Sequence, residues 1–261
     1  MAATMADPAA ARHIGPGDGT TESQWARCHR LAAVPAAHMS DLAPAGARVV
    51  VVAPHPDDEI LAAGGLLALA TQIGLPVALV AVTDGCASHP ASRLWPPERL
   101  AAERPRETLA AFKSLGVQAQ NLVRLGLPDG GLTAMETELA RQLCDLLRPG
   151  DTVATTWQLD GHPDHEATGR AAAHAARTAG ARCIEAPVWA WHWARPGDAR
   201  MPWHRARRLP LPAAIARRKQ VAIDAFASQL APDPSTGAEP VLRATTVARA
   251  ARPFETFFLP E

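Results

Sequence analysis

Apolar and polar positions follow two alternating patterns over most of the chain. Short apolar runs bounded by turn residues are typical of strands buried on both faces, and they occur at residues 48–54, 76–83, 120–128, 151–157 and 182–191. Segments with apolar residues at helical spacing lie between and after them, at residues 59–74, 97–116, 135–148, 165–180 and 212–229. This alternation predicts an α/β domain whose mostly parallel sheet is covered by helices on both faces.

The two ends of the chain depart from this pattern. Residues 1–45 are rich in Ala, Gly, Pro and Thr without a sustained apolar period, so we expect a flexible leader with one short helix, followed by a domain over residues 46–261. Beyond residue 195 the pattern weakens into Pro-rich turns. Inside the domain, Pro105 predicts a break in its helix, and the glycine pair at residues 64–65 predicts close packing of a helix against the sheet.

Polar clusters follow four of the predicted strands. They read HPDDE, TDGCASH, LPDGG and DGHPDH, at residues 55–59, 83–89, 127–131 and 160–165. Because parallel strands place ligands at their carboxyl ends, we expect these clusters to converge on one pocket.

Two His-Pro-Asp elements carry the chemistry of these clusters. Catalytic zinc takes three ligands from His and carboxylate side chains and keeps a position for water, a set that His55, Asp58 and His165 could supply. Asp57 could then take a proton from the water, and His162 could hand one to a leaving group. Either element alone could be a helix N-cap. Two of them at separate strand ends favour a shared site.

Composition narrows the function classes. The formal net charge is zero, so no overall field would attract nucleic acid or an anionic membrane. The four cysteines are far apart without a CxxC pair, which argues against a disulfide framework and favours a reducing, cytoplasmic location. No apolar run reaches the roughly 18 residues of a membrane span.

At these motifs the sequence resembles the LmbE or PIG-L family of zinc-dependent deacetylases, which includes N-acetylglucosaminyl-phosphatidylinositol de-N-acetylase and the mycothiol and bacillithiol biosynthetic deacetylases. The resemblance covers about residues 47–185 and rests on PHPDDE, TDG, an Arg-x-x-Glu helix followed by LGV, LGLPDG and GHPDH. It implies a Rossmann-like three-layer α/β/α fold with a mostly parallel sheet.

The resemblance also implies roles for single residues. Asp57 matches the general base, His162 the residue that stabilises the oxyanion or protonates the amine, and Asp164 would orient a histidine. The matching zinc ligands are His55, Asp58 and His165. Zinc rests on the resemblance and on general ligand preference, so Fe²⁺ or another divalent transition metal stays open.

Substrate contacts are implied at two further positions. Arg104 matches an arginine that contacts substrate, and Asp129 an acidic residue near the sugar hydroxyls. Some family members carry a tyrosine where this chain has Asp160, and no tyrosine is present here. Cys86 is expected to line the pocket, and the tryptophans of residues 189–193 could form a wall for a sugar or pack in the core.

The predicted function is hydrolytic removal of an N-acyl group, first of all N-acetyl, from an amino-sugar-containing small molecule. One alternative is an amidase that cleaves a larger acyl group or a thiol conjugate. The other is a non-catalytic metal-binding module of the same fold, against which the presence of both Asp57 and His162 argues. The aglycone, the pathway and assembly into a homo-oligomer stay open at this point.

Overall fold

A β-sheet forms the centre of the molecule. The structure is a computed structural model that describes residues 12–118 and 121–261. Within these residues, seven strands pair in the order β3-β2-β1-β4-β5-β7-β6. Strands β1 to β5 are mutually parallel, whereas β7 runs antiparallel to both of its neighbours. The strands are β1 (Val49–Ala53), β2 (Val77–Thr83), β3 (Leu122–Leu127), β4 (Thr152–Thr156), β5 (Arg182–Ala186), β6 (Ala206–Pro210) and β7 (Phe254–Phe258).

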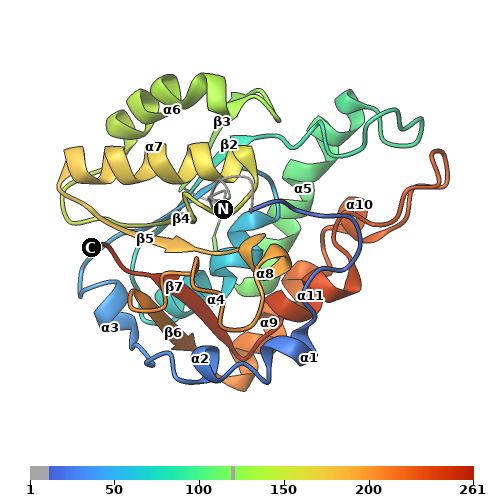
Figure 1. The fold of residues 1–261 in the computed structure, drawn as a ribbon. Coiled ribbons are helices and arrows are strands. Elements are labelled where there is room, and N and C mark those ends of the chain that lie inside the picture. Colours follow the sequence, from blue (N-terminus) through green and yellow to red (C-terminus); the bar gives the residue numbers. More distant parts are fainter. Residues whose placement is uncertain (1–11, 119–120) are drawn as a thin grey trace, which may run out of the picture.

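Helices cover both faces of this sheet (Figure 1). The long helices are α4 (Asp58–Gln72), α5 (Pro97–Leu115), α6 (Leu132–Leu146), α7 (Pro163–Ala179) and α9 (Ala213–Ile223). The short ones are α1 (Glu22–Trp25), α2 (His29–Ala32), α3 (Met39–Leu42), α8 (Ala190–Trp193), α10 (Ala227–Leu230) and α11 (Ala244–Ala250). Helices α6 and α7 lie on one face, and α4, α5 and α9 on the other. In the described part of the chain, no helix is long and apolar enough to cross a membrane.

Strand β1 shows why the sheet is buried on both sides. Val49 and Val51 pack into the core beneath α4 and α9, and Val50 and Val52 pack beneath α6 and α7. All four side chains are at most 2 % exposed, and burial of each valine contributes roughly 1.5–3 kcal/mol. The predicted three-layer α/β architecture is thereby confirmed, and the carboxyl end of β1 is held from both faces.

The predicted flexible leader does not match residues 12–45. Trp25 of α1 is 1 % exposed and contacts Trp191 edge-on, with the ring centroids 5.0 Å apart. Leu42 of α3 is fully buried, and the Ala37 N–H donates to the carbonyl of Arg208 in β6. A few large side chains anchor this stretch despite its weak apolar period. Residues 1–11 of the predicted leader lie outside the described residues.

Two local predictions also change. Helix α5 continues through Pro105, because its packing against α9 and α4 outweighs the hydrogen bond and the close packing that a proline disrupts. The predicted strand over residues 182–191 ends at Ala186, and the chain then forms α8. The tryptophans of this segment therefore do not share the face of one strand.

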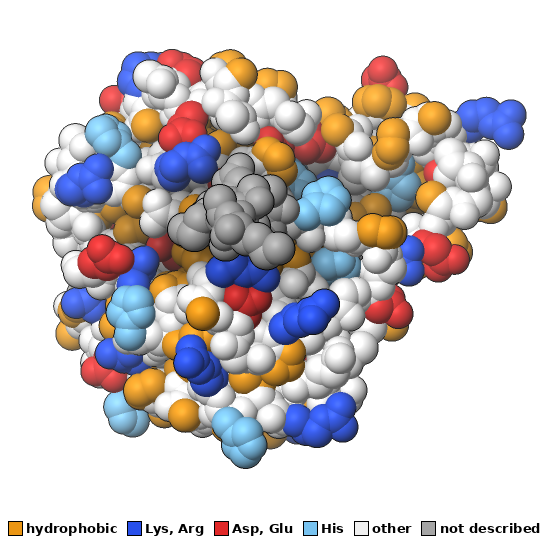
Figure 2. All heavy atoms as spheres, viewed as in Figure 1, with side chains coloured by type: hydrophobic (Ala, Val, Ile, Leu, Met, Phe, Trp, Pro, Cys, Tyr) orange, Lys and Arg blue, Asp and Glu red, His pale blue; other side chains and the backbone are white. Residues whose placement is uncertain are grey.

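On the surface, charged side chains of both signs are interspersed over the face shown in Figure 2. This agrees with the zero formal net charge. The face offers no broad patch of a single sign that would attract a polyanion.

Candidate active site

The four polar clusters meet at the carboxyl edge of the parallel strands, as predicted. A cavity of about 320 Å³ opens there. It is lined by seven of the eight predicted site residues, namely His55, Asp57, Asp58, Arg104, Asp129, His162 and His165. The eighth, Asp164, does not line the cavity but contacts His55. Segments more than 100 residues apart in sequence thus supply one site.

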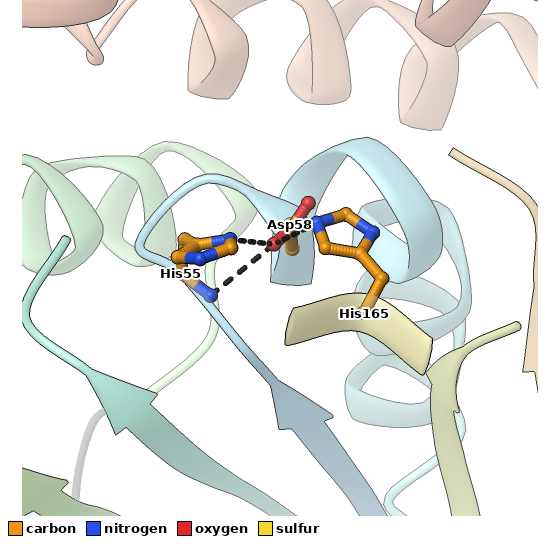
Figure 3. A group of neighbouring side chains, drawn as sticks. All are labelled: His55, Asp58 and His165. Carbon is orange, nitrogen blue, oxygen red and sulfur yellow. Dashed lines mark hydrogen bonds and ion pairs between the residues drawn. The ribbon is translucent and has the colours of Figure 1, made fainter. Parts of the chain in front are cut away.

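Three side chains point toward one another at the base of this cavity (Figure 3). Asp58 Oδ2 lies 3.1 Å from His55 Nδ1 and 3.1 Å from His165 Nε2. Ligand atoms about 2.1 Å from a tetrahedral zinc ion are roughly 3.4 Å apart, so this spacing is close to that of a metal site. His165 Nε2 is buried and makes no well-aligned hydrogen bond although Asp58 Oδ2 lies 3.1 Å away, which is compatible with a ligand atom directed at a metal instead of at the carboxylate.

Carboxylates on the far side of both rings orient them. His165 Nδ1 is 2.9 Å from Asp160 Oδ2, and His55 Nε2 is 3.2 Å from Asp164 Oδ2. A histidine that donates one ring N–H to a carboxylate presents the lone pair of its other nitrogen to a metal. With a metal bound, each neutral imidazole would direct the lone pair of its other nitrogen at the position beside Asp58. The expectation that Asp164 orients a histidine agrees with this contact.

The electrostatics of the three residues favour positive charge at this point. Burial disfavours a charged His165, but Asp58 and Asp160 outweigh it and raise the pKa of His165 to about 9. The pKa of His55 is also raised, because hydrogen bonds to surrounding carboxylates overcome burial. The pKa of Asp58 is lowered against burial by the two histidines. A bound divalent cation would satisfy the same demand, so the donor set fits a metal.

Asp57 lies beside these ligands with an unusual backbone. Its φ of 131° is a conformation that L-residues rarely adopt, and such strain persists where the surrounding structure holds it in place. Asp57 is the N-cap residue of α4 but makes no side-chain cap hydrogen bond. The alternative of a simple helix cap therefore lacks support. Burial raises the pKa of Asp57 to about 8, against the opposing effect of Arg104.

Arg104 contacts the carboxylate of Asp57. Its Nη2 lies 2.9 Å from Asp57 Oδ2, and its Nη1 donates to the Gly85 carbonyl at 2.8 Å. Gly85 has a φ of 66°, and a side chain there would collide with the guanidinium. Arg104 is only 2 % exposed, so the contacts seen here are with the protein. Its predicted contact with substrate stays a prediction.

His162 closes another side of the cavity. Its ring lies 5.0 Å from that of His55 and 4.8 Å from that of His165, measured between centroids. Burial, reinforced by these two imidazoles, lowers the pKa of His162 to about 3. Its Nδ1 accepts the N–H of Asp164 at 3.2 Å. A neutral ring that accepts at Nδ1 carries its proton at Nε2, so His162 offers an N–H donor.

Asp129 faces the cavity from the loop after β3. Its Oδ1 is 3.2 Å from His55 Nε2, and its Oδ2 accepts the N–H of Ala87 at 2.6 Å. Burial opposes ionisation, but the contacts with His55 and Ala87 outweigh it and lower the pKa of Asp129 to about 2. The carboxylate is therefore ionised and remains a hydrogen-bond acceptor at the cavity.

The tryptophans after β5 divide between cavity and core. Trp189 lines the cavity, next to Val188. Trp191 packs on Trp25, and Trp193 stacks on Trp157 with ring centroids 6.4 Å apart. Only Trp189 is thus placed to meet a substrate, and the other two stabilise the fold.

The role of Asp160 was not predicted from the sequence, where this residue was noted only as standing in place of a tyrosine. Asp160 is fully buried and accepts the backbone N–H groups of residues 188–190 in addition to contacting His165. It therefore ties the loop after β5 to the candidate metal ligand. The sequence offered one signal for this role. Asp160 stands five residues before His165, and a carboxylate buried there would need several hydrogen-bond donors around it.

Comparison with known proteins finds a family that matches the region of the site. Residues 50–176 match the model of a family described as "PIG-L: GlcNAc-PI de-N-acetylase". These residues are similar to the PIG-L family. The PIG-L match includes every predicted site residue, from His55 to His165. The resemblance inferred from the sequence is confirmed.

Curated relatives of this region come from Bacillus. The chain is 33% identical over 138 residues to "Probable N-acetyl-alpha-D-glucosaminyl L-malate deacetylase 2" of Bacillus anthracis, covering 50% of this chain and 59% of the relative. The protein of the same description from Bacillus subtilis (strain 168) is 31% identical over 133 residues, covering 47% and 58%. The chain thus spans about three fifths of the length of these relatives.

Solved structures share the fold of this protein. The conserved protein TT1542 from Thermus thermophilus superposes with a TM-score of 0.57 at 26% identity, covering 82% of this chain and 94% of that one. A deacetylase in complex with teicoplanin, from the biosynthesis pathway of teicoplanin, gives a TM-score of 0.60 at 22% identity, covering 81% and 97%. At this identity the second likeness supports the fold alone.

Proposed function

We propose that this protein is a zinc-dependent hydrolase that removes an N-acetyl group from an amino-sugar-containing small molecule. The observation that carries the proposal is the meeting of three candidate metal ligands with Asp57 and His162 in one cavity. Metal binding alone requires neither of the last two residues, so their presence favours catalysis over a binding module. The deacetylase descriptions of the Bacillus relatives support the same reaction class.

His55 Nδ1, Asp58 Oδ2 and His165 Nε2 would hold the metal. Two imidazole nitrogens and one carboxylate oxygen are a donor set that zinc takes in hydrolytic sites, with a further position left open. When bound there, the ion would act as a Lewis acid and make water more acidic. The buried carboxylates around the ligands keep both rings in the required tautomer.

The remaining steps belong to Asp57 and His162. Arg104 contacts Oδ2 of Asp57, so Oδ1 is the oxygen proposed to take a proton from the attacking water. As the water oxygen bonds to the amide carbon, His162 Nε2–H would donate to the carbonyl oxygen that becomes negative. The C–N bond then breaks, and the proton held by Asp57 passes to the departing nitrogen. The products are the free amine and acetate.

The proposed substrate contacts complete the site. The ionised Asp129 would accept hydrogen bonds from sugar hydroxyls, and the Trp189 indole offers an apolar face on which a sugar ring could stack. Arg104 would act on substrate mainly through Asp57. A cytoplasmic location belongs to the same proposal, supported by four unpaired cysteines.

The test is acetate release from a panel of N-acetylglucosamine conjugates. Enzyme stripped of metal is compared with the same sample after zinc is restored, and zinc-loaded Asp57→Asn serves as the control for contaminating activity. Zinc-restored turnover by the wild type, absent from the control, is the expected result. Silence across the panel from protein with stoichiometric zinc would reject an N-acetylglucosamine substrate and leave a larger acyl amide as the rival.

A further inference from the structure

Helix α4 is broken one turn after it begins. Ala63 has φ −142° and ψ 16°, well outside the helical region, between two helical segments. In an unbroken helix the N–H of Gly65 would donate to the carbonyl of Leu61. Here both groups bond elsewhere, to side chains from other elements.

A buried ion pair occupies the gap. Glu255 of β7 accepts the N–H groups of Gly65 at 2.6 Å and Leu66 at 2.8 Å. Lys219 of α9 donates to the Leu61 carbonyl at 3.0 Å, and its Nζ lies 2.6 Å from Glu255 Oε1. Each charge thus meets the end of the half-helix whose dipole it complements. Both side chains are only 2 % exposed.

The glycine pair makes this approach possible. A Cβ at Gly65 would lie 2.4 Å from the Leu211 side chain and 3.0 Å from the Glu255 carboxyl carbon. A Cβ at Gly64 would lie 3.4 Å from the Lys219 side chain. The close packing expected from these glycines therefore admits an ion pair as well as neighbouring apolar groups.

The first segment of α4 carries functional groups. Asp58 is its first residue, and Leu61, whose carbonyl Lys219 holds, lines the catalytic cavity. We propose that Lys219 and Glu255 are positioning residues that keep the first turn of α4 apart from the rest of the helix, so that Asp58 faces both histidines. This inference rests on the proposed metal site, and its failure is distinguishable from failure of that site.

The test replaces both charges with apolar groups of similar size, in Lys219→Met/Glu255→Leu. Such replacement of a buried pair is often neutral or stabilising for the fold, and it frees Leu61 and Gly65 to bond to each other. We expect a thermal midpoint equal to or above that of the wild type, together with a zinc Kd about 10- to 100-fold weaker, the usual effect of losing a supporting contact. If the pair served stability alone, its replacement would not weaken zinc affinity while leaving the thermal stability equal or higher.

The matched control is Arg48→Met/Asp151→Leu. Arg48 and Asp151 form another ion pair, 2.6 Å apart, that also bonds backbone groups, but it lies at the amino ends of β1 and β4. Zinc affinity should be unchanged in this variant. Zinc affinity is measured by competition with a chromophoric chelator, and the geometry of the site by the visible absorption of the Co²⁺-loaded protein.

Single variants keep the test decisive if the double variant does not fold. Lys219→Arg retains the charge and donors and should keep zinc affinity within about threefold, whereas the isosteric Glu255→Gln should weaken it about tenfold. An unchanged Kd and Co²⁺ spectrum in folded Lys219→Met/Glu255→Leu, or in Glu255→Gln, would overturn the inference. Absence of zinc binding by the wild type would instead reject the proposed metal site.

Discussion

The letters His-Pro-Asp occur twice in this chain, at residues 55–57 and 162–164, and the two elements are used differently. In the first, the helix begins at Asp58, after the proline, so the turn supplies His55 and Asp58 to the candidate metal site. In the second, the helix begins at the proline itself, so His162 becomes the N-cap and the ligand His165 is the third residue of the helix instead of the first. The position of the helix start, more than the motif, sets each role.

The surroundings separate the two leading histidines further. His55 contacts three carboxylates, and its pKa is raised although burial opposes this. His162 faces two imidazoles, and burial lowers its pKa to about 3. The surroundings of His55 therefore favour positive charge at this ring, whereas His162 remains a neutral donor. The same residue type at the same motif position thus serves opposite electrostatic purposes.

The largest expected effect separates Asp58, which directly follows the first element, from Asp164 in the second. Asp58→Asn removes a proposed ligand, and we expect zinc binding to fail and kcat/KM to fall by about 10³-fold or more, since a metal supplies several kcal/mol to the barrier. Asp164→Asn should cost only about 10- to 100-fold, because Asp164 acts through His55. Metal content and turnover of the two purified variants check this. Equal losses would contradict the different roles.

Asp57 has no catalytic counterpart in the second element. Asp57→Asn should keep its metal, yet lose about 10²- to 10⁴-fold in kcat, the range expected for a general base. The measurement is turnover by protein whose zinc content equals that of the wild type. Near-normal turnover with zinc bound would show that another group takes the proton.

Substitutions of His162 test whether this ring acts as a neutral hydrogen-bond donor. His162→Ala should lower kcat by about 10²- to 10³-fold with a smaller change in KM, because the lost hydrogen bond forms chiefly in the transition state. His162→Gln, which can still present an N–H, should recover part of this loss. A variant that instead loses zinc would place His162 among the ligands.

Substitution of Asp160 has the smallest expected effect, and it tests how His165, the ligand that follows the second element, is oriented. Asp160→Asn keeps the shape of the side chain but removes the charge that orients His165, so zinc affinity should weaken about 10- to 100-fold. Chelator competition measures it. Because Asp160 also accepts three backbone N–H groups, the thermal midpoint of the metal-free protein is measured alongside. An unchanged zinc affinity would limit Asp160 to holding the loop.

Sequence patterns predicted the sheet, its helices and the convergence of the four clusters, because buried strands and strand ends leave local signals. They could not predict which helix position each motif residue takes. They also missed Asp160, whose role depends on three N–H groups from a loop almost 30 residues away. The ion pair of Lys219 and Glu255 joins residues 36 apart in sequence to the break in α4, and no local pattern records it.

Other errors arose where tertiary packing outweighed local preference. Pro105 is accommodated inside α5, and residues 12–45 are anchored by buried side chains such as Trp25 and Leu42. The strand expected over residues 182–191 ended early because Asp160 captures the N–H groups that follow it. In each case a contact from a distant segment decided the local structure.

The position of β7 has a consequence for the order in which this protein is made. β7 follows β6 in the chain but lies between β5 and β6 in the sheet. It also carries Glu255, which bonds the broken helix that begins at Asp58. At about 5–20 residues per second, a ribosome reaches Glu255 roughly 10–40 s after Asp58. Once β6 has been made, it has no partner within the sheet until β7 follows. The turn that bears Asp58 lacks the contact with Glu255 throughout the whole interval.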